Sequence, residues 1–475
     1  MSTVVRWGFA AALIALLAGC DAKSNDEKRD DAAFDPTPDS GDLGFVHAIS
    51  DAPSVTVAFA GSNGGADQFV LGYGQARQES LLVGGYNIQV NYEDPDGNTV
   101  TLVELLGDDN IKLFTQDETT LVLAGTLANP TIFQVENTEY GYGDANRNNT
   151  ALDPQVQFLH TVSGRTSVDF YLTASGANLA GATPVTLAFG AASALQDIAP
   201  GSDYRVRVTA PGNSTDVLYD SGTTSFSSNT RALLGAFNYF GPGDAQLRVK
   251  SVRGVASTFP NEPYVSAYRA GSLVADVPAI DVFLGPTSGA PVIAGQAFQT
   301  VSAYVTRSSG SFDGNVTVAG VPADLLFSGN IPLSSADATV QYFAGLQSDP
   351  ASGNALNVVG PGAVEDNRPI PGYAQVRAVN GAADSEPLNV YLLRSGETTA
   401  NEDPDFPLLG FGVTQAVVTG AGDYDLLIQS SAGTTLIGPE RITLADTNLY
   451  SLLLTDTAGG GAPLEWVLDP SPIGF

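Results

Sequence analysis

The segment VQFLHTVSGRTSVDFYLTASG, residues 156–176, alternates apolar and polar side chains on both sides of a short turn. Val156 and Phe158 precede the turn, and Val168 and Phe170 follow it. Because side chains alternate between the two faces of a strand, this spacing puts the apolar residues on one face. The segment therefore predicts two half-buried strands joined by a turn.

The same pattern occurs three more times, at intervals of roughly 110 residues. The corresponding segments are LGFVHAISDAPSVTVAFAG (43–61), VSAYRAGSLVADVPAIDVFLG (265–285) and VRAVNGAADSEPLNVYLLRSG (376–396). Aligning the four segments near the end of the first strand gives the polar anchors His47, His160, Arg269 and Asn380. In the third segment the second strand begins three residues late, which predicts a longer turn there. The chain therefore contains an internal repeat.

The correspondence continues downstream, where a glycine followed closely by an aromatic residue opens a further strand. These aromatic residues are Tyr86, Tyr204, Phe312 and Tyr424. A repeat of about 110 residues with seven or so short strands has the size of an immunoglobulin-like domain. We therefore expect an all-β fold of tandem immunoglobulin-like β-sandwiches. Each strand is expected to turn one apolar face to the opposing sheet and one polar face to water.

The repeat defines the expected domains. Candidate boundaries are 43–153, 154–258, 259–371 and 372–475, and the third copy is the most degenerate. Long amphipathic helical stretches are hard to find after residue 20, and 52 Gly and 28 Pro residues are consistent with many turns.

Residues 1–19 are expected to be a lipoprotein signal peptide. Arg6 precedes an apolar run from Trp7 to Ala18, which is too short to span a bilayer comfortably and suits a cleaved signal sequence. The end of the run, Leu17-Ala18-Gly19-Cys20, resembles the bacterial lipobox, and Cys20 is the only cysteine. The resemblance implies acylation of Cys20 and attachment to a membrane of the bacterial cell envelope, either periplasmic or surface-exposed. An ordinary signal peptide with an incidental cysteine is the alternative.

Residues 20–42 are expected to be an acidic, flexible tether, because they contain few large apolar side chains and many aspartates. The whole chain has 51 acidic and 20 basic residues and a net charge of −31. Such a polyanion is repelled by phosphate backbones, so nucleic acid is not an expected partner. No other segment is long and apolar enough to suggest a transmembrane helix.

At the repeat the chain resembles the DUF-4397 family, a bacterial domain of unknown function that often occurs in tandem in exported proteins. Val46-His47-Ala48 with Asp51-Ala52-Pro53 is similar to the start of the family pattern, and Val168-Asp169-Phe170-Tyr171 is similar to its continuation. Ile280-Asp281-Val282-Phe283 and Asn389-Val390-Tyr391 are looser matches. The resemblance implies a sandwich fold and an exported protein, and it implies no reaction.

Residues for catalysis are scarce, so we expect no enzyme. A Ser-His-Asp triad would have to use His47 or His160, and only the second repeat keeps both a histidine and the Asp of the family pattern. We found no nucleophile elbow, zinc motif or phosphate-binding loop. We expect each imidazole to form a hydrogen bond into the following turn. The donors Arg269 and Asn380 could take over that role.

Metal ligands are also weakly indicated, and no cofactor is expected. Oxygen donors cluster in predicted turns at Asp94, Asp96 and Asn98, at Asp108 and Asp109, and at Glu402, Asp403 and Asp405. Calcium needs six to eight oxygens, and each cluster supplies only part of that number. The same residues are preferred in tight turns, which is the favoured interpretation, with calcium as the alternative.

These observations favour a non-catalytic, lipid-anchored envelope protein that acts as a scaffold, spacer or adhesion-type binder through loops of its sandwiches. An envelope protein or a glycan would be its partner, besides the membrane. The alternative is a module that binds extracellular glycan or another polymer, assisted by calcium. Trp466 and several tyrosines could provide an aromatic platform for it, although core packing is the preferred role for most aromatic residues.

Overall fold

The computed structural model describes residues 40–63, 65–115, 117–138, 153–201, 203–253, 257–259, 264–348, 358–360, 362–383 and 385–472. Within these residues the chain consists of strands and turns, together with one short 3-10 helix, η2 (Gly107–Asp109). The same part of the chain holds no helix of the length and apolarity that crossing a membrane requires. The expected all-β class is confirmed.

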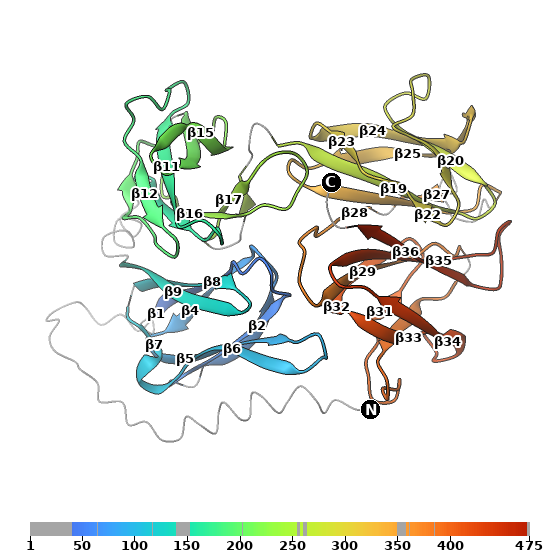
Figure 1. Cartoon of the computed structure of the whole chain (residues 1–475), viewed down its shortest axis with the longest axis horizontal. Helices are drawn as coiled ribbons and strands as arrows, with labels where there is room; N and C mark the ends of the chain where they lie inside the picture. The colour runs from blue at the N-terminus through green and yellow to red at the C-terminus, as the bar shows by residue number, and fades with distance from the viewer. Residues whose placement is uncertain are drawn as a thin grey trace, which may run out of the picture. The chain divides into compact units, whose positions relative to one another are not determined.

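The first sandwich contains β1 (Ser40–His47), β2 (Val55–Gly61), β3 (Ala66–Leu71), β4 (Ala76–Leu82), β5 (Gly84–Glu93), β6 (Thr99–Leu105), β7 (Ile111–Leu113), β8 (Asp117–Thr126) and β9 (Asn129–Thr138). One sheet has the order β4-β1-β8-β9, and the other has the order β3-β2-β5-β6 with β7 beside β5. Figure 1 shows the two layers, with β8 and β9 in one and β5 and β6 in the other.

The second sandwich contains β10 (Gln155–His160), β11 (Ser167–Ala174), β12 (Val185–Ala188), β13 (Gln196–Asp197), β14 (Tyr204–Ala210), β15 (Asn213–Asp220), β16 (Arg231–Asn238), β17 (Leu247–Ser251) and β18 (Ser257–Thr258). Its sheets have the orders β13-β10-β16-β17-β18 and β12-β11-β14-β15. In the core between them, the rings of Phe158 and Phe170 stack with centroids 4.8 Å apart. The repeat's first two strands therefore belong to opposite layers.

The third sandwich contains β19 (Ser266–Val274), β20 (Ala279–Leu284), β21 (Ile293–Ala297), β22 (Thr300–Val301), β23 (Val305–Arg307), β24 (Gly310–Val318), β25 (Val321–Leu333), β26 (Ala338–Gly345), β27 (Val358–Val359) and β28 (Gly362–Val364). Its sheets have the orders β22-β19-β26-β27 and β21-β20-β24-β25, with β23 beside β19 and β28 beside β26.

The fourth sandwich contains β29 (Tyr373–Asn380), β30 (Leu388–Leu393), β31 (Phe406–Leu409), β32 (Thr414–Gly420), β33 (Gly422–Ser430), β34 (Thr435–Leu444), β35 (Asn448–Thr455) and β36 (Glu465–Pro472). Its sheets have the orders β32-β29-β35-β36 and β31-β30-β33-β34. Apart from β1, which begins at Ser40 within the expected tether, the strands of each sandwich fall within one of the four segments expected from the repeat.

All four sandwiches share one connectivity. In each sandwich the first strand pairs in parallel with a strand near the end of the repeat. These pairs are β1 with β8, β10 with β16, β19 with β26 and β29 with β35. The pairings with the remaining strands are antiparallel. This order, with at least four strands in each sheet, differs from the seven-stranded order of a constant-type immunoglobulin domain, although the two-layer architecture is the same.

The glycine and aromatic pattern has a local cause. Three of the strands that carry the aromatic residue start at a glycine with a φ of 152°, 155° or 152°, at Gly84, Gly310 and Gly422. A side chain would make this backbone conformation unfavourable. Two residues later, the hydroxyl of Tyr86 donates to the carbonyl oxygen of Leu82 at 2.6 Å, and that of Tyr424 donates to Gly420 at 2.6 Å. The glycine and the aromatic residue therefore stabilise the backbone conformation at the start of the strand.

The strands that form the parallel pairs are buried on both faces over most of their length. In β19, β26 and β29 every residue is buried. The expectation that each strand turns a polar face to water is therefore wrong for these central strands. The reason is that the outer face of each sheet packs against a neighbouring sandwich.

The first two sandwiches form one compact unit. Between their doubly buried sheets lies one apolar cluster, which includes Val46, Val122, Leu159, Leu233 and Phe237. In Figure 1, β8 and β9 face β16 and β17 across this layer. The unit thus has an additional apolar core, to which both sandwiches contribute residues.

Equivalent residues of the two repeats meet across this layer. The hydroxyl oxygens of Ser50 and Ser163 lie 3.4 Å apart, and a guanidinium nitrogen of Arg231 lies 3.2 Å from a carboxylate oxygen of Glu118. Both pairs are 113 residues apart, as His47 and His160 are. Contact between a residue and its own counterpart is the mark of a two-fold, isologous interface. The two repeats are therefore related by an approximate two-fold axis.

The last two sandwiches form a second compact unit of the same design. Leu273, Tyr342, Val379 and Leu453 belong to one apolar cluster between them. At its centre the hydroxyls of Tyr342 and Ser451 share a hydrogen bond of 2.9 Å. Pairing of sandwiches through the doubly buried sheets is therefore a property of both units.

Candidate functional site

The polar residue at the end of the first strand ties down the following turn. In His47, Nδ1 accepts from the Ile49 amide at 3.4 Å, and Nε2 lies 3.0 Å from the carbonyl oxygen of Pro53. His160 forms the equivalent pair, with the Val162 amide at 3.3 Å and the Arg165 carbonyl oxygen at 3.1 Å. Since a carbonyl can only accept, Nε2 carries the proton in both imidazoles.

Asn380 makes the same connections with an amide. Its Oδ1 accepts from the Ala382 amide at 3.1 Å, and its Nδ2 donates to the Ser385 hydroxyl at 2.8 Å and to the Leu409 carbonyl at 3.1 Å. Like both histidines, Asn380 is fully buried. In these three repeats the position is a hydrogen-bonding centre for the turn.

Arg269 does not occupy this position, because the third repeat is shifted by three residues. The Gly74 amide donates to the carbonyl of His47, and in the third repeat the corresponding bond runs from Gln299 to Ser272. Ser272 is therefore the structural counterpart of His47. The signal was present in the sequence, because Asp51-Ala52-Pro53 and Asp276-Val277-Pro278 each begin four residues past His47 and Ser272.

The histidine and the aspartate of the family pattern do not act as a pair. The buried carboxylate of Asp169 accepts from the Thr186 hydroxyl at 2.5 Å and from the Gly212 amide at 2.7 Å. Asp281 accepts from the amides of Gly295 at 2.7 Å and Gly320 at 2.8 Å. These aspartates hold the ends of neighbouring hairpins.

Burial lowers the pKa of His160 to about 4, although its hydrogen bond to the Arg165 carbonyl acts in the opposite direction. The unfolded chain therefore binds a proton first as the pH falls, and stability is lost between about pH 6.5 and 4. We expect His160→Asn, which copies Asn380, to keep the hydrogen bonds and to remove about 2–3 kcal/mol of this pH-dependent loss. Thermal unfolding at pH 7.5 and 4.5 checks this, and an equal pH response of both proteins contradicts it.

The first group of calcium candidates forms a hairpin turn. The Asp94 carboxylate accepts from the Asn98 amide at 2.8 Å and from the Asn98 side chain at 3.2 Å. Asp96 lies in the same turn, and Asp108 and Asp109 lie in η2. These contacts are typical of residues that close a turn.

In the second group the side chains differ in their surroundings. Glu402 and Asp403 are exposed, whereas Asp405 is half-buried and accepts from the Leu392 amide at 2.7 Å. Burial raises the pKa of Asp405 to about 6, which this amide only partly offsets. Among the described residues no three His, Cys, Asp or Glu side chains come together as a metal site would require.

Asp405 gives a pH-dependent prediction of the opposite sign. Because its pKa is raised in the folded protein, the stability it contributes is present below about pH 4 and is lost as the pH rises through 6. The free energy of unfolding of Asp405→Asn, relative to that of the wild type, should therefore be higher at pH 8 than at pH 4 by about 2–3 kcal/mol. Urea unfolding of both proteins at the two pH values measures this difference. Equal effects at both pH values would contradict it.

Cys20, the expected lipidation site, lies outside the described residues, as do the signal peptide and most of the tether. The prediction for Cys20 therefore rests on the sequence.

Two clusters of buried charge connect the paired sandwiches. In the first unit Glu118 lies against Arg231 and Arg253, and burial lowers the pKa of Arg253 to about 10. In the second unit the side chains of Arg269 and Glu365 are 2% and 0% exposed. These partners could not be identified from local sequence patterns, because 113 residues separate Glu118 from Arg231 and 96 separate Arg269 from Glu365.

Arg269 has a central place in the second cluster. Its Nε donates to Glu365 at 2.7 Å, and its Nη1 donates to the Ser471 hydroxyl of the fourth sandwich at 2.5 Å. The Tyr304 hydroxyl also donates to Glu365, and the guanidinium lies 4.8 Å from the Tyr304 ring centroid. Burial alone would lower the pKa of Arg269, but the Glu365 carboxylate raises it. Arg269 thus remains charged and joins the third sandwich to the fourth.

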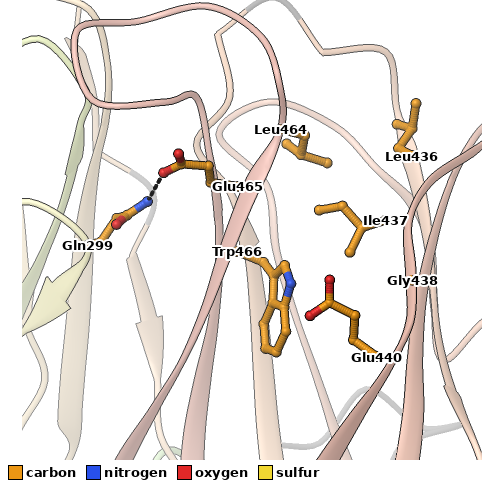
Figure 2. A pocket seen from close by; sticks show the side chains of 8 residues that line it. All are labelled: Gln299, Leu436, Ile437, Gly438, Glu440, Leu464, Glu465 and Trp466. Atoms are coloured by element: carbon orange, nitrogen blue, oxygen red, sulfur yellow. Dashed lines mark hydrogen bonds between the residues drawn. The ribbon is translucent and has the colours of Figure 1, made fainter.

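A surface groove in the second unit combines an indole with carboxylates. Its volume is about 410 Å³, and Figure 2 shows its lining: Gln299, Leu436, Ile437, Gly438, Glu440, Leu464, Glu465 and Trp466. Trp466 is half-buried and packs against the core of the fourth sandwich. The Gln299 side chain donates to Glu465 at 2.9 Å and to Thr455 at 2.9 Å. The groove is the strongest candidate for binding a ligand.

No protein-family model and no curated protein matches the chain. Among solved structures, it is similar to the Bacillus anthracis TIE protein at 9% identity and a TM-score of 0.16, covering 86% of this chain and 69% of that one. CBMbc of family CBM26 from Eubacterium rectale Amy13K, solved in complex with maltoheptaose, matches at 11% identity and a TM-score of 0.15, covering 42% of this chain and 94% of that one. A putative cell adhesion protein from Parabacteroides distasonis matches at 10% identity and a TM-score of 0.11, covering 91% and 99%. Scores this low carry no argument about fold or function.

Proposed function

We propose that the chain is a non-catalytic, lipid-anchored protein of the bacterial cell envelope that acts as a spacer or scaffold. The observation that carries the proposal is the pairing of sandwiches through doubly buried sheets. A unit whose two domains share one interior resists bending at the joint between them, because any hinge motion would expose apolar surface to water. Such units are suited to holding a binding surface at a fixed distance from a membrane.

The anchor is the first part to test. The segment Leu17-Ala18-Gly19-Cys20, which resembles a lipobox, supports attachment through acyl chains, which stay in the bilayer when several chains are present. Cells expressing the chain should incorporate an alkyne-labelled fatty acid into it, and the protein should fractionate with membranes. Cys20→Ser should lose both properties. A labelled Cys20→Ser protein, or an unlabelled wild type, would refute the anchor.

The spacer role has its own readout in limited proteolysis. If each pair behaves as one rigid body, proteolysis of the full chain should give resistant fragments that each contain two sandwiches. Accumulation of single-sandwich fragments of about 110 residues would show that the joints inside the pairs open freely, and it would remove the basis of the proposal.

We also propose membership of the DUF-4397 family. The support is the match at His47, His160, Asp169 and Asp281, together with the structural tasks of these residues. Both the aspartate and the residue at the histidine position organise turns, which gives a physical reason for the pattern without a reaction.

A second candidate function is binding of a ligand at the groove that contains Trp466. The specific observation in its favour is the placement of an indole ring and two carboxylates at an open sandwich edge. A glycan or another extracellular polymer would then be the ligand of a displayed module.

A further inference from the structure

The groove lies at the edge of the fourth sandwich, beside the last strand of each of its two sheets. β34 and β36 are the edge strands of the two sheets of the fourth sandwich. In the other sandwiches the corresponding edges come together, β6 with β9, β15 with β17 and β25 with β27. In the fourth sandwich the same edge holds the groove of about 410 Å³. At this edge of the fourth sandwich the lining includes residues of both strands, among them Leu436 and Glu440 on β34 and Glu465 and Trp466 on β36.

Two side chains of the groove, Trp466 and Glu440, stand where the first sandwich has aliphatic residues. Trp466 lies opposite Leu454, and the counterpart of this pair in the first sandwich is Ile132 opposite Leu123. The second sandwich has Val249 at this place.

The same comparison applies to Glu440, which lies opposite Leu426. Leu426 is two residues past Tyr424, as Ile88 is two residues past Tyr86, and the residue opposite Ile88 is Leu105. A carboxylate thus stands where the first sandwich packs a leucine against its core. The first sandwich forms the same two-layer fold with Ile132 and Leu105 at these places.

The charge of the lining is negative and uncompensated. Of the eight lining residues, Glu440 and Glu465 are charged and none is basic. Glu465 is held by Gln299, whereas Glu440 is exposed and forms no ion pair with a described residue. In Figure 2 the Glu440 carboxylate and the Trp466 indole face the same space.

We propose that this groove binds the ammonium group of an organic amine. An indole ring is the best aromatic partner for such a cation, and a carboxylate beside it adds charge attraction. Leu436 and Ile437 provide an apolar wall for the alkyl chain that carries the amine. The net charge of −31 further raises the local concentration of cations. The site goes beyond the spacer role and does not depend on the lipid anchor.

Fluorescence gives a selective test, because Trp7 and Trp466 are the only tryptophans. In full-length Trp7→Phe protein, emission excited at the indole band reports only on the groove. Titration with 1,5-diaminopentane should change this emission, and 1,5-pentanediol, which has the same chain without charge, should not. Binding should weaken as salt is added. Loss of charge in Glu440→Gln should weaken it about tenfold, and Glu402→Gln, an exposed charge in the same sandwich, should leave it unchanged.

Trp466→Leu tests the aromatic contact through equilibrium dialysis with radiolabelled diamine, and should reduce binding by about tenfold. A lysine tripeptide with blocked ends and its Nε-acetylated form distinguish a free amine from a peptide-borne one. The unmodified peptide should bind, and acetylation should abolish its binding. Equal responses to the diamine and the diol, or a response to a neutral oligosaccharide without one to the diamine, would overturn the proposal. A Glu440→Gln protein that binds as the wild type does would also overturn it.

Discussion

Glu365→Ala is expected to lower the free energy of unfolding of the second unit by about 3–5 kcal/mol. The change removes the carboxylate that accepts from Arg269 and Tyr304, and it leaves the Arg269 guanidinium charged and buried. An unpaired charge in a dry interior is among the costliest defects a folded protein can carry. Denaturant unfolding of Trp7→Phe protein measures the effect, because Trp466 lies in the affected unit.

A double variant separates the charge from the packing. Arg269→Met together with Glu365→Leu removes both charges and keeps apolar volume, so it should recover most of the stability that Glu365→Ala loses. Tyr304→Phe, which deletes one hydrogen bond to Glu365, should cost only about 1–2 kcal/mol. If Glu365→Ala unfolds at the same denaturant concentration as the wild type, the network contributes nothing to the joint.

Cysteines at positions 50 and 163 should form a disulfide within the first unit. In the wild type the hydroxyl oxygens of Ser50 and Ser163 lie 3.4 Å apart, although 113 residues separate them. A crosslink that closes a loop of this length stabilises a protein by up to about 4–5 kcal/mol through the unfolded chain. The variant Ser50→Cys/Ser163→Cys/Cys20→Ser should therefore oxidise spontaneously and unfold at a higher temperature than its reduced form.

The control places one cysteine elsewhere on the second sandwich. Ser50→Cys/Ser175→Cys/Cys20→Ser has the same number of thiols, but Ser175 lies beyond β11, where its amide bonds to Asp203. This protein should stay reduced or form only intermolecular crosslinks. Non-reducing electrophoresis and mass spectrometry distinguish these outcomes. Free thiols at positions 50 and 163 after oxidation would contradict the two-fold packing of the repeats.

The sequence predicted the two-layer repeat because alternation along strands is a local property. Val156, Phe158, Val168 and Phe170 report on the core between the two sheets of one sandwich. The burial of the outer faces of the central strands was not predicted. The apolar run Ala232-Leu233-Leu234-Gly235-Ala236-Phe237 is typical of a strand buried on both sides, and it was the available sign that a second sandwich covers the sheet.

The register of the third repeat shows how a plausible alignment can fail. Arg269 is polar like His47, but Ser272 occupies the equivalent position in the strand, and the carboxylate of Asp276 forms the hydrogen bonds of the turn that follows. Its carboxylate accepts from the amides of Gln347 and Ser348 at 2.7 and 2.8 Å. Burial would raise its pKa, but these donors outweigh burial and lower it. Turn residues were therefore a better guide to equivalence than the polar residue in the strand.

The groove could not be derived from the sequence, because it depends on where two distant edge strands lie relative to each other. Trp466 was recognised as an available aromatic residue, but its association with Glu440 arises only when β34 and β36 approach from different sheets. The buried pair of Arg269 and Glu365 has the same origin. Interactions between sheets are set by the sum of many packing contacts, and local spacing does not encode them.

The two-fold pairing of repeats restricts how the gene can change in length. Deleting one sandwich would leave its former partner with a whole sheet of uncovered apolar side chains, such as Val46 and Val122, and would favour aggregation. Loss or duplication of a complete pair leaves no such surface. We therefore expect viable relatives of this protein to differ by two sandwiches at a time, and even numbers of copies to predominate among them.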